Sequence, residues 1–201
     1  HHSTIFVSTI FDSSVTPTPT SGVGGGISVS TDFGVSWTHI PQPLDPGAPA
    51  EYIIRANGDT IPIVSVRTAI DNTTFDLATT DTSIWIASFA GGIRSAKINS
   101  SQAIGNFQLT ALPPDALDET LPGQNYNFTV DPFANLNHRA FSVITARDGI
   151  WAGTANGINH SADNGLSWKK FTHQNSGISG NFVTALGEQI YTESNITYRN
   201  I

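Results

Sequence analysis

The sequence predicts an all-β chain in which antiparallel sheets of about four short strands are repeated. Two turn signals, Asp148-Gly149 and Asn156-Gly157, separate short β-rich runs, because these residues tolerate the positive φ that a two-residue hairpin requires. Gly, Ser, Thr, Asn and Pro are abundant, whereas Lys, Glu and Leu are sparse, a balance typical of many strands joined by turns. Amphipathic segments with a helical period are hard to find.

The most regular stretch is residues 141–171. It contains four β-like runs, and Asn164-Gly165 marks a third turn before the last of them. This stretch therefore predicts a four-stranded antiparallel meander.

Further strands are expected on both sides of this meander. Before it they are predicted at residues 3–11, 27–30, 35–40, 63–70, 77–80, 83–88, 91–98 and 107–112, and after it at residues 181–186, 190–194 and 195–199. Polar or proline-rich stretches predict loops at residues 12–23, 41–62 and 113–127.

The runs repeat along the chain. An Ile-aromatic pair opens a β-rich run at Ile5-Phe6, Ile84-Trp85, Ile150-Trp151 and Ile190-Tyr191, and a Gly-Ile pair follows in the first three repeats at residues 26–27, 92–93 and 157–158. A repeat of tens of residues that contains several strands indicates a propeller or another stacked β array, because one such sheet cannot cover its own apolar faces.

We therefore expect a single β-propeller segment over residues 1–201, with about four blades of four antiparallel strands. Two complete blades are expected at about residues 63–112 and 139–171, and two partial ones at about residues 3–40 and 181–201. Since the first blade lacks its first strand and the last lacks its final strand, the phase favours a piece of a larger ring, closed by further blades or chains.

Composition restricts the function classes. The net charge is −7, and the nine Lys and Arg residues are dispersed, so a nucleic-acid partner is not expected. No apolar run has the roughly 20 residues of a membrane span. The absence of cysteine excludes disulfides and thiolate chemistry, and the absence of methionine indicates a fragment or a processed product.

Two segments fit the pattern Ser-x-Asp-x-Gly-x-Ser-Trp. Their matching residues are Ser30, Asp32, Gly34 and Trp37 in the first, and Ser161, Asp163, Gly165 and Trp168 in the second. The pattern resembles the Asp-box, or bacterial neuraminidase repeat, of sialidase-like, sortilin-type, xyloglucanase-like and photosystem II assembly-factor-like propellers. The second repeat departs from it at residues 96–100.

The resemblance implies a structural turn rather than a ligand site. We expect the Asp to accept hydrogen bonds from turn amides, the Gly to take positive φ, and the Trp to be a buried apolar side chain that begins the next strand. All four tryptophans are expected in the core.

Sialidase activity is not expected, because the arginine sequence that accompanies this chemistry is missing. A hydrolase with two carboxylates stays open, since acidic residues on adjacent loops could face each other. The tentative ligand residues on the long loops are Tyr52, Asp115, Asp118, Glu119 and Tyr126, with Asp45, Glu51, Asp59, Phe128 and Phe133 as weaker ones.

No metal or cofactor site is expected. The histidines show no ligand spacing, and residues 22–26 lack the lysine and helix of a phosphate loop. Five Asn-x-Ser/Thr sequons leave glycosylation open, at Asn72, Asn99, Asn127, Asn159 and Asn195.

The sequence thus predicts a non-catalytic binding or scaffolding module of a secreted or cell-surface protein, with a protein or glycan partner. The alternatives are a glycoside hydrolase with paired carboxylates, and a structural subunit of an extracellular assembly.

Overall fold

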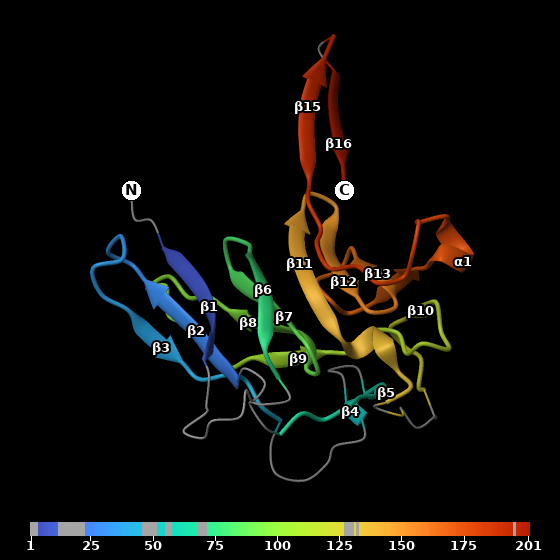
Figure 1. The fold of residues 1–201 in the computed structure, drawn as a ribbon, viewed down its shortest axis with the longest axis horizontal. Helices are drawn as coiled ribbons and strands as arrows, with labels where there is room; N and C mark the ends of the chain where they lie inside the picture. Colours follow the sequence, from blue (N-terminus) through green and yellow to red (C-terminus); the bar gives the residue numbers. More distant parts are fainter. Residues whose placement is uncertain are drawn as a thin grey trace, which may run out of the picture.

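The structure, a computed structural model, describes residues 4–11, 23–45, 52–54, 58–67, 72–126, 131, 133–194 and 196–201. The chain is all-β in class, as the sequence predicts, and its paired strands are antiparallel. Three larger sheets follow one another in sequence order, and a two-stranded hairpin projects beyond the third sheet (Figure 1). Closure into a propeller stays a prediction.

The first and second sheets carry three and four strands. The first is β1-β2-β3, formed by Ile5–Phe11, Val23–Ser30 and Thr38–Ile40. The second is β6-β7-β8-β9, formed by Thr74–Thr79, Ser83–Ser88, Gly92–Lys97 and Gln108–Thr110. Each sheet is a meander, since neighbours in sequence are neighbours in space.

The third sheet contains the meander predicted over residues 141–171. Its strands β11, β12, β13 and β14 are Ala140–Ala146, Gly149–Thr154, Gly157–Ser161 and Trp168–Phe171. A short strand, β10 (Glu119–Thr120), joins β14 as a fifth strand, although the sequence predicts a loop there. The turn at Gly149 has a φ of 135° and that at Gly157 a φ of 115°, as the turn signals require.

Other short elements complete the described chain. β4 (Tyr52–Ile54) pairs with β5 (Thr60–Pro62) inside a stretch predicted as a loop. η1 (Leu136–His138) precedes β11, and α1 (His173–Ser176) follows β14. β15 (Gln189–Glu193) and β16 (Ile196–Asn200) form the projecting hairpin.

Two predicted strands are wrong. Of the strand predicted at residues 63–70, residues 63–67 are not in a strand and residues 68–70 lie outside the described residues. Residues 181–186 are not in a strand either, although both segments are rich in β-branched or apolar residues. The backbone of residues 181–183 instead hydrogen-bonds to the ends of β12 and β13. Val183 N donates to Thr154 O (2.9 Å), and Asn181 O accepts from Gly157 N (2.6 Å).

The second sheet is buried on both faces. On one side Ile84 and Ile86 pack with Ile27 and Val29 of the first sheet. On the other side Trp85 and Ala87 pack with the third sheet, including Val143, Ala152 and Trp168. Alternate residues of β7 thus enter two different cores, which explains why this strand is apolar throughout.

Asparagine side chains connect consecutive sheets. Asn72, just before β6, donates to Pro43 O (2.8 Å), which follows β3. Asn137, just before β11, donates to Pro113 O (2.6 Å), which follows β9. Asn181 accepts from His173 N (2.7 Å), which follows β14. In each case an asparagine side chain connects the end of one sheet with the segment that precedes the next repeat.

Asn137 is at the centre of a buried hydrogen-bond network. It has no exposed surface and exchanges hydrogen bonds with Asn159 (2.8 and 3.0 Å), while its Oδ1 accepts from Thr154 Oγ1 at 2.6 Å. A buried polar group that loses its partner costs more than the net value of one hydrogen bond. This network therefore fixes the third sheet against the loop that enters it.

We expect Asn137→Ala to lower the free energy of unfolding by about 2–3 kcal/mol, because the buried Asn159 side chain and Pro113 O lose hydrogen bonds and Thr154 Oγ1 keeps only its bonds to Gly157 O and Asn156 N. Urea unfolding followed by tryptophan fluorescence measures this. The matched control is Asn106→Ala at an exposed position, which should change stability by less than about 0.5 kcal/mol. Equal effects of the two variants would contradict the role of the buried network.

Candidate functional site

The second Asp-box segment is a closed hydrogen-bonded turn. Asp163 Oδ1 accepts from Ser161 Oγ (2.8 Å) and Ser167 N (2.8 Å), and Asp163 Oδ2 accepts from Ser167 Oγ (2.6 Å). Gly165 N donates to Ser161 Oγ at 2.7 Å, and Gly165 has a φ of 83°. Both carboxylate oxygens are occupied within the turn.

The first Asp-box segment repeats these contacts. Asp32 accepts from Ser30 Oγ (2.8 Å), Ser36 N (2.9 Å) and Ser36 Oγ (2.5 Å), and Gly34 N donates to Ser30 Oγ (2.8 Å). Gly34 has a φ of 86°. The two segments therefore have the same local structure, and neither carboxylate is free for chemistry.

The tryptophans of the two segments differ. Trp168 begins β14 and is buried against the second sheet, whereas Trp37 precedes β3 and is exposed. The prediction that all four tryptophans lie in the core is wrong for Trp37. It is also wrong for Trp151, which is partly buried and stacks on His160 with ring centroids 4.1 Å apart. The second sheet supplies a neighbour for Trp168, and no described residue does the same for Trp37.

The predicted ligand residue Asp115 is a structural cap. Its carboxylate accepts from the amides of Leu136 and Asn137 (both 2.8 Å), and its carbonyl accepts from Lys170 Nζ (2.9 Å). Asp118 O accepts from Lys170 N (2.6 Å). These contacts anchor the loop to β14 and to η1, so they do not bring the acidic residues together at a cleft.

The remaining loop candidates do not converge either. Glu119 is exposed in β10, and the Tyr126 hydroxyl accepts from Leu121 N and donates to Gln124 Oε1 (both 2.9 Å). Asp45 forms an ion pair with Arg94 (2.9 Å). The Asp59 carboxylate accepts a hydrogen bond from Gly123 N, and Phe133 is exposed. Glu51, Phe128 and the side chain of Tyr52 lie outside the described residues.

Two of the predicted sequons are closed to modification in the folded chain. Asn72 and Asn159 have no exposed surface, and both side chains are hydrogen-bonded. A glycan cannot be accommodated on either amide in this structure. Within the described part of the chain, no group of three His, Asp or Glu could hold a metal ion.

An exposed aromatic cluster lies where the second and third sheets meet. We call its four side chains, Phe75, Phe89, Phe141 and Phe182, the phenylalanine surface. The ring centroids are 5.6 Å apart for Phe75–Phe141, 6.0 Å for Phe89–Phe141 and 4.9 Å for Phe141–Phe182. Phe75 is 48% exposed, Phe89 38% and Phe182 65%. A contiguous apolar patch of this kind is unusual on a surface that only contacts water.

Three of these rings are equivalent in the repeat, a signal that sequence reasoning missed. Thr74-Phe75-Asp76-Leu77, Ala140-Phe141-Ser142-Val143 and Asn181-Phe182-Val183-Thr184 align, and the phenylalanine comes second each time. In β6 and β11 the pairing register shifts at this residue. A β-bulge releases its extra residue from strand alternation and turns the side chain outward.

A cation borders the phenylalanine surface. The guanidinium of Arg139 lies 5.6 Å from the centroid of Phe89, within the range of a cation–π contact. Among the described residues, no carboxylate forms an ion pair with Arg139. The surface therefore combines four aromatic rings with one positive charge that an incoming carboxylate could meet.

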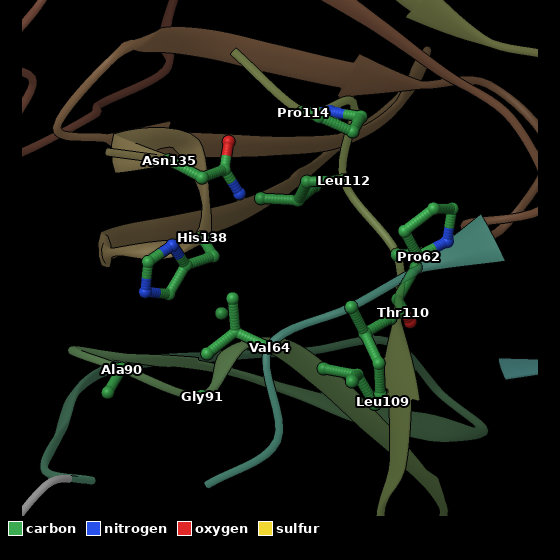
Figure 2. Close-up of a pocket in the computed structure, with 13 residues that line it drawn as sticks. Pro62, Val64, Ala90, Gly91, Leu109, Thr110, Leu112, Pro114, Asn135 and His138 are labelled. Carbon is green, nitrogen blue, oxygen red and sulfur yellow. The ribbon is translucent and has the colours of Figure 1, made fainter. Parts of the chain in front are cut away.

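A small pocket lies at the same end of the sheets. Ala90 and Gly91, which follow Phe89, and His138, which precedes Arg139, line it together with Val64 and Leu109 (Figure 2). Its volume is about 30 Å³, room for one or two waters or the tip of one side chain. Burial lowers the pKa of His138, so the ring is neutral at pH 7. The pocket is apolar and small.

A wider cleft lies between β1, β6 and β11. Its described acidic residues are Asp76 and Glu188. Asp76 accepts from the amides of Leu77 (2.8 Å) and Val143 (3.0 Å), and Glu188 pairs with Arg199. Both carboxylates are held by structural partners, so the cleft does not present the free pair that glycoside hydrolysis uses.

Comparison with known proteins gives one distant structural match. No protein-family model matches the chain, and no curated protein matches it. The chain is similar to the extracellular domain of a putative hybrid two component system from B. thetaiotaomicron, with a TM-score of 0.35 and 16% identity. The match covers 87% of this chain and 18% of that one. No helix in the described residues has the length and hydropathy needed to span a membrane.

The Asp-box carboxylates predict an acid-sensitive fold. Hydrogen bonds from the hydroxyl and amide of Ser36, and from Ser30, lower the pKa of Asp32 from 3.8 to about 2. Burial opposes ionisation of Asp163, but the hydroxyl and amide of Ser167 outweigh it and lower its pKa. Since the folded pKa values lie below the unfolded ones, this stabilisation is present above about pH 4 and is lost as the pH falls toward 2.

We expect Asp32→Asn with Asp163→Asn to destabilise the chain at pH 6, and the difference from the wild type to shrink between about pH 4 and pH 2. Urea unfolding at a series of pH values measures it. The control is Asn106→Ala at an exposed position, which changes no titratable group, so its difference from the wild type should stay constant. A pH-independent difference for the double variant would contradict the assignment.

Proposed function

We propose that this chain is a segment of a β-propeller that acts as a non-catalytic binding module, and that the phenylalanine surface contacts the partner. The observation that carries the proposal is the cluster in which the exposed Phe75, Phe89 and Phe182 surround the partly buried Phe141. Aromatic side chains dominate the energy of many protein interfaces, and exposed patches of them mark such sites. An extracellular or cell-surface location is part of the proposal, supported by the resemblance of the Asp-box segments.

A protein partner fits this surface better than a glycan does. Sugar recognition combines an aromatic face with several hydrogen-bonding groups, whereas the charged group in contact with these rings, among the described residues, is the guanidinium of Arg139. An apolar segment with a carboxylate would meet both the rings and the guanidinium.

The propeller part of the proposal is supported by the repeats. Consecutive sheets share the Ile-aromatic run, two of them share the Asp-box turn, and asparagines connect each sheet to the next. A structural role in an extracellular assembly is compatible with the same surface. The hydrolase alternative has less support, since Asp76 and Glu188 are both engaged.

We expect Phe75→Ser with Phe182→Ser to weaken partner binding about 30-fold, equivalent to the roughly 2 kcal/mol of an interface hot spot. The partner is isolated by pull-down with the intact protein, glycans are tested on an array, and affinities are then measured by calorimetry. The control is Leu166→Ser, an exposed apolar residue outside the phenylalanine surface.

The proposal fails if the wild type binds neither proteins nor glycans and turns over a polysaccharide instead. It also fails if the Leu166→Ser control and the double variant weaken binding equally, since the phenylalanine surface would then have no specific role.

A further inference from the structure

A polar cleft lies between the second and third sheets, at the end of the strands opposite to the phenylalanine surface. Its volume is about 470 Å³, and its walls are the β6–β7 turn, β8, the segment that enters β9 and the second Asp-box turn. Ser83, at one end of β7, borders the cleft, whereas Phe89 of the phenylalanine surface directly follows the other end. Both sheets lie inside the described chain, so neither wall is formed by residues at the beginning or end of the sequence.

The pairing register explains why the floor of this cleft is polar. Trp85, Ser95 and Gln108 pair across β7, β8 and β9, so they form one row on the same face of the second sheet. On β8, Ile93 and Lys97 lie on this face too, two residues to either side of Ser95. Ile93 is buried in the core with the third sheet. The face that packs against the third sheet therefore changes from apolar to polar within one strand.

The first sheet shows what fills this position elsewhere. In the Gly-Ile alignment, Val29 is the equivalent of Ser95. Val29 is 7% exposed and packs in the core between the first and second sheets. Ser95 is partly exposed, and its shorter side chain leaves space between the second and third sheets. The cleft is thus a consequence of residues that are particular to the second repeat.

The third sheet supplies the opposite wall. Its Asp-box turn approaches so closely that a Cβ on Gly165 would lie 3.0 Å from Trp85 Cη2, and the neighbouring Asn164 lines the cleft. Trp85 is 2% exposed, and its Nε1 has no hydrogen-bond partner among the described residues. An unpaired buried N–H is unfavourable, and a hydroxyl oxygen of a ligand is one acceptor that could pair with it.

The polar side chains of the cleft are not engaged with the rest of the described chain. The hydroxyl of Ser95 and the amides of Asn106 and Gln108 form no hydrogen bond within it, and neither does the amide of Asn164. Lys97 forms no ion pair there. The Asp-box carboxylates differ, since both are fully engaged within their turns. Several hydrogen-bonding groups are therefore available to one molecule in the cleft.

The chemistry of these groups selects the ligand. Amides and hydroxyls both donate and accept hydrogen bonds, and the two charged residues of the cleft, Asp81 and Lys97, have opposite signs. An apolar ligand would leave the amides unpaired, and an anion would meet the carboxylate of Asp81. Among the described residues no group of three potential ligands could hold a metal ion. A saccharide fits, because it is uncharged and each of its hydroxyls donates and accepts.

We propose that the polar cleft binds a neutral saccharide of one or two sugar units. Its volume of about 470 Å³ lies within the range of small-molecule sites. The site goes beyond the binding function proposed for the phenylalanine surface and does not rest on it.

The test is isothermal titration calorimetry of the whole chain with maltose, cellobiose and lactose as probes. The wild type is expected to bind at least one of them. Ser95→Val is expected to weaken this binding about tenfold or more, because the larger side chain fills the floor of the cleft. Asn106→Ala with Gln108→Ala is expected to weaken it about tenfold through the loss of hydrogen bonds. Gln174→Ala, which changes an exposed amide outside the cleft, is the matched control and should bind like the wild type.

Two further measurements separate a loss of binding from other causes. Ser95→Val introduces the residue that the first repeat buries at this position, so urea unfolding should show a stability no lower than that of the wild type. The Phe75→Ser, Phe182→Ser variant should bind the saccharide like the wild type, which separates this site from the phenylalanine surface.

Three results would overturn the proposal. The first is that none of the three disaccharides binds. The second is saccharide binding that Ser95→Val and the Asn106→Ala, Gln108→Ala variant leave unchanged, because the sugar would then occupy another site. The third is binding of sodium phosphate or free glycine, titrated in the same way, that these variants weaken while no saccharide binds, because the cleft would then select a charged ligand.

Discussion

Each of the larger sheets is apolar on both faces, and this requirement for a neighbour on each side organises the chain. In β7, Ile84 and Ile86 enter one core, and Trp85 and Ala87 enter the other. Burial of apolar area contributes roughly 25 cal/mol per Å², so a sheet covered on one side only loses much of its stabilisation. The larger sheets therefore stack in sequence order.

The sequence predicts local turns well because their chemistry is local. Gly149, Gly157 and both Asp-box turns have the positive φ or the hydrogen bonds that their residues indicate. It predicts strands poorly where pairing depends on a distant edge. Residues 63–67 have a suitable composition for a strand, but pairing requires an edge in register, and the chain around them forms β5 and the asparagine contact at Asn72 instead.

The candidate site was harder to predict than the fold. Acidic and aromatic loop residues drew attention because they could perform chemistry, yet Asp115 caps η1. Phe141 and Phe182 occupy predicted strands, where an apolar residue suggests the core, and Phe75 lies between two predicted strands. Alternation places a strand residue on one face or the other, but a bulge cannot be read from the residues of one strand alone, because it is a property of the pairing with the next. Only the alignment of the repeats could have indicated these positions.

The exposure of these phenylalanines is not accounted for by the stability of the sheets. A bulged residue has no partner across the ladder, so a small or polar side chain would satisfy the backbone equally well and would expose no aromatic area. Contacts between the rings remove part of this aromatic area from water, but Phe182 remains the most exposed ring of the cluster. The exposed Trp37 is a different case. Its equivalent in the third sheet, Trp168, is buried against the preceding sheet, which shows the kind of neighbour that covers this position. For the phenylalanine surface, no repeat within the described residues shows a covering sheet, which is why we assign it to a partner.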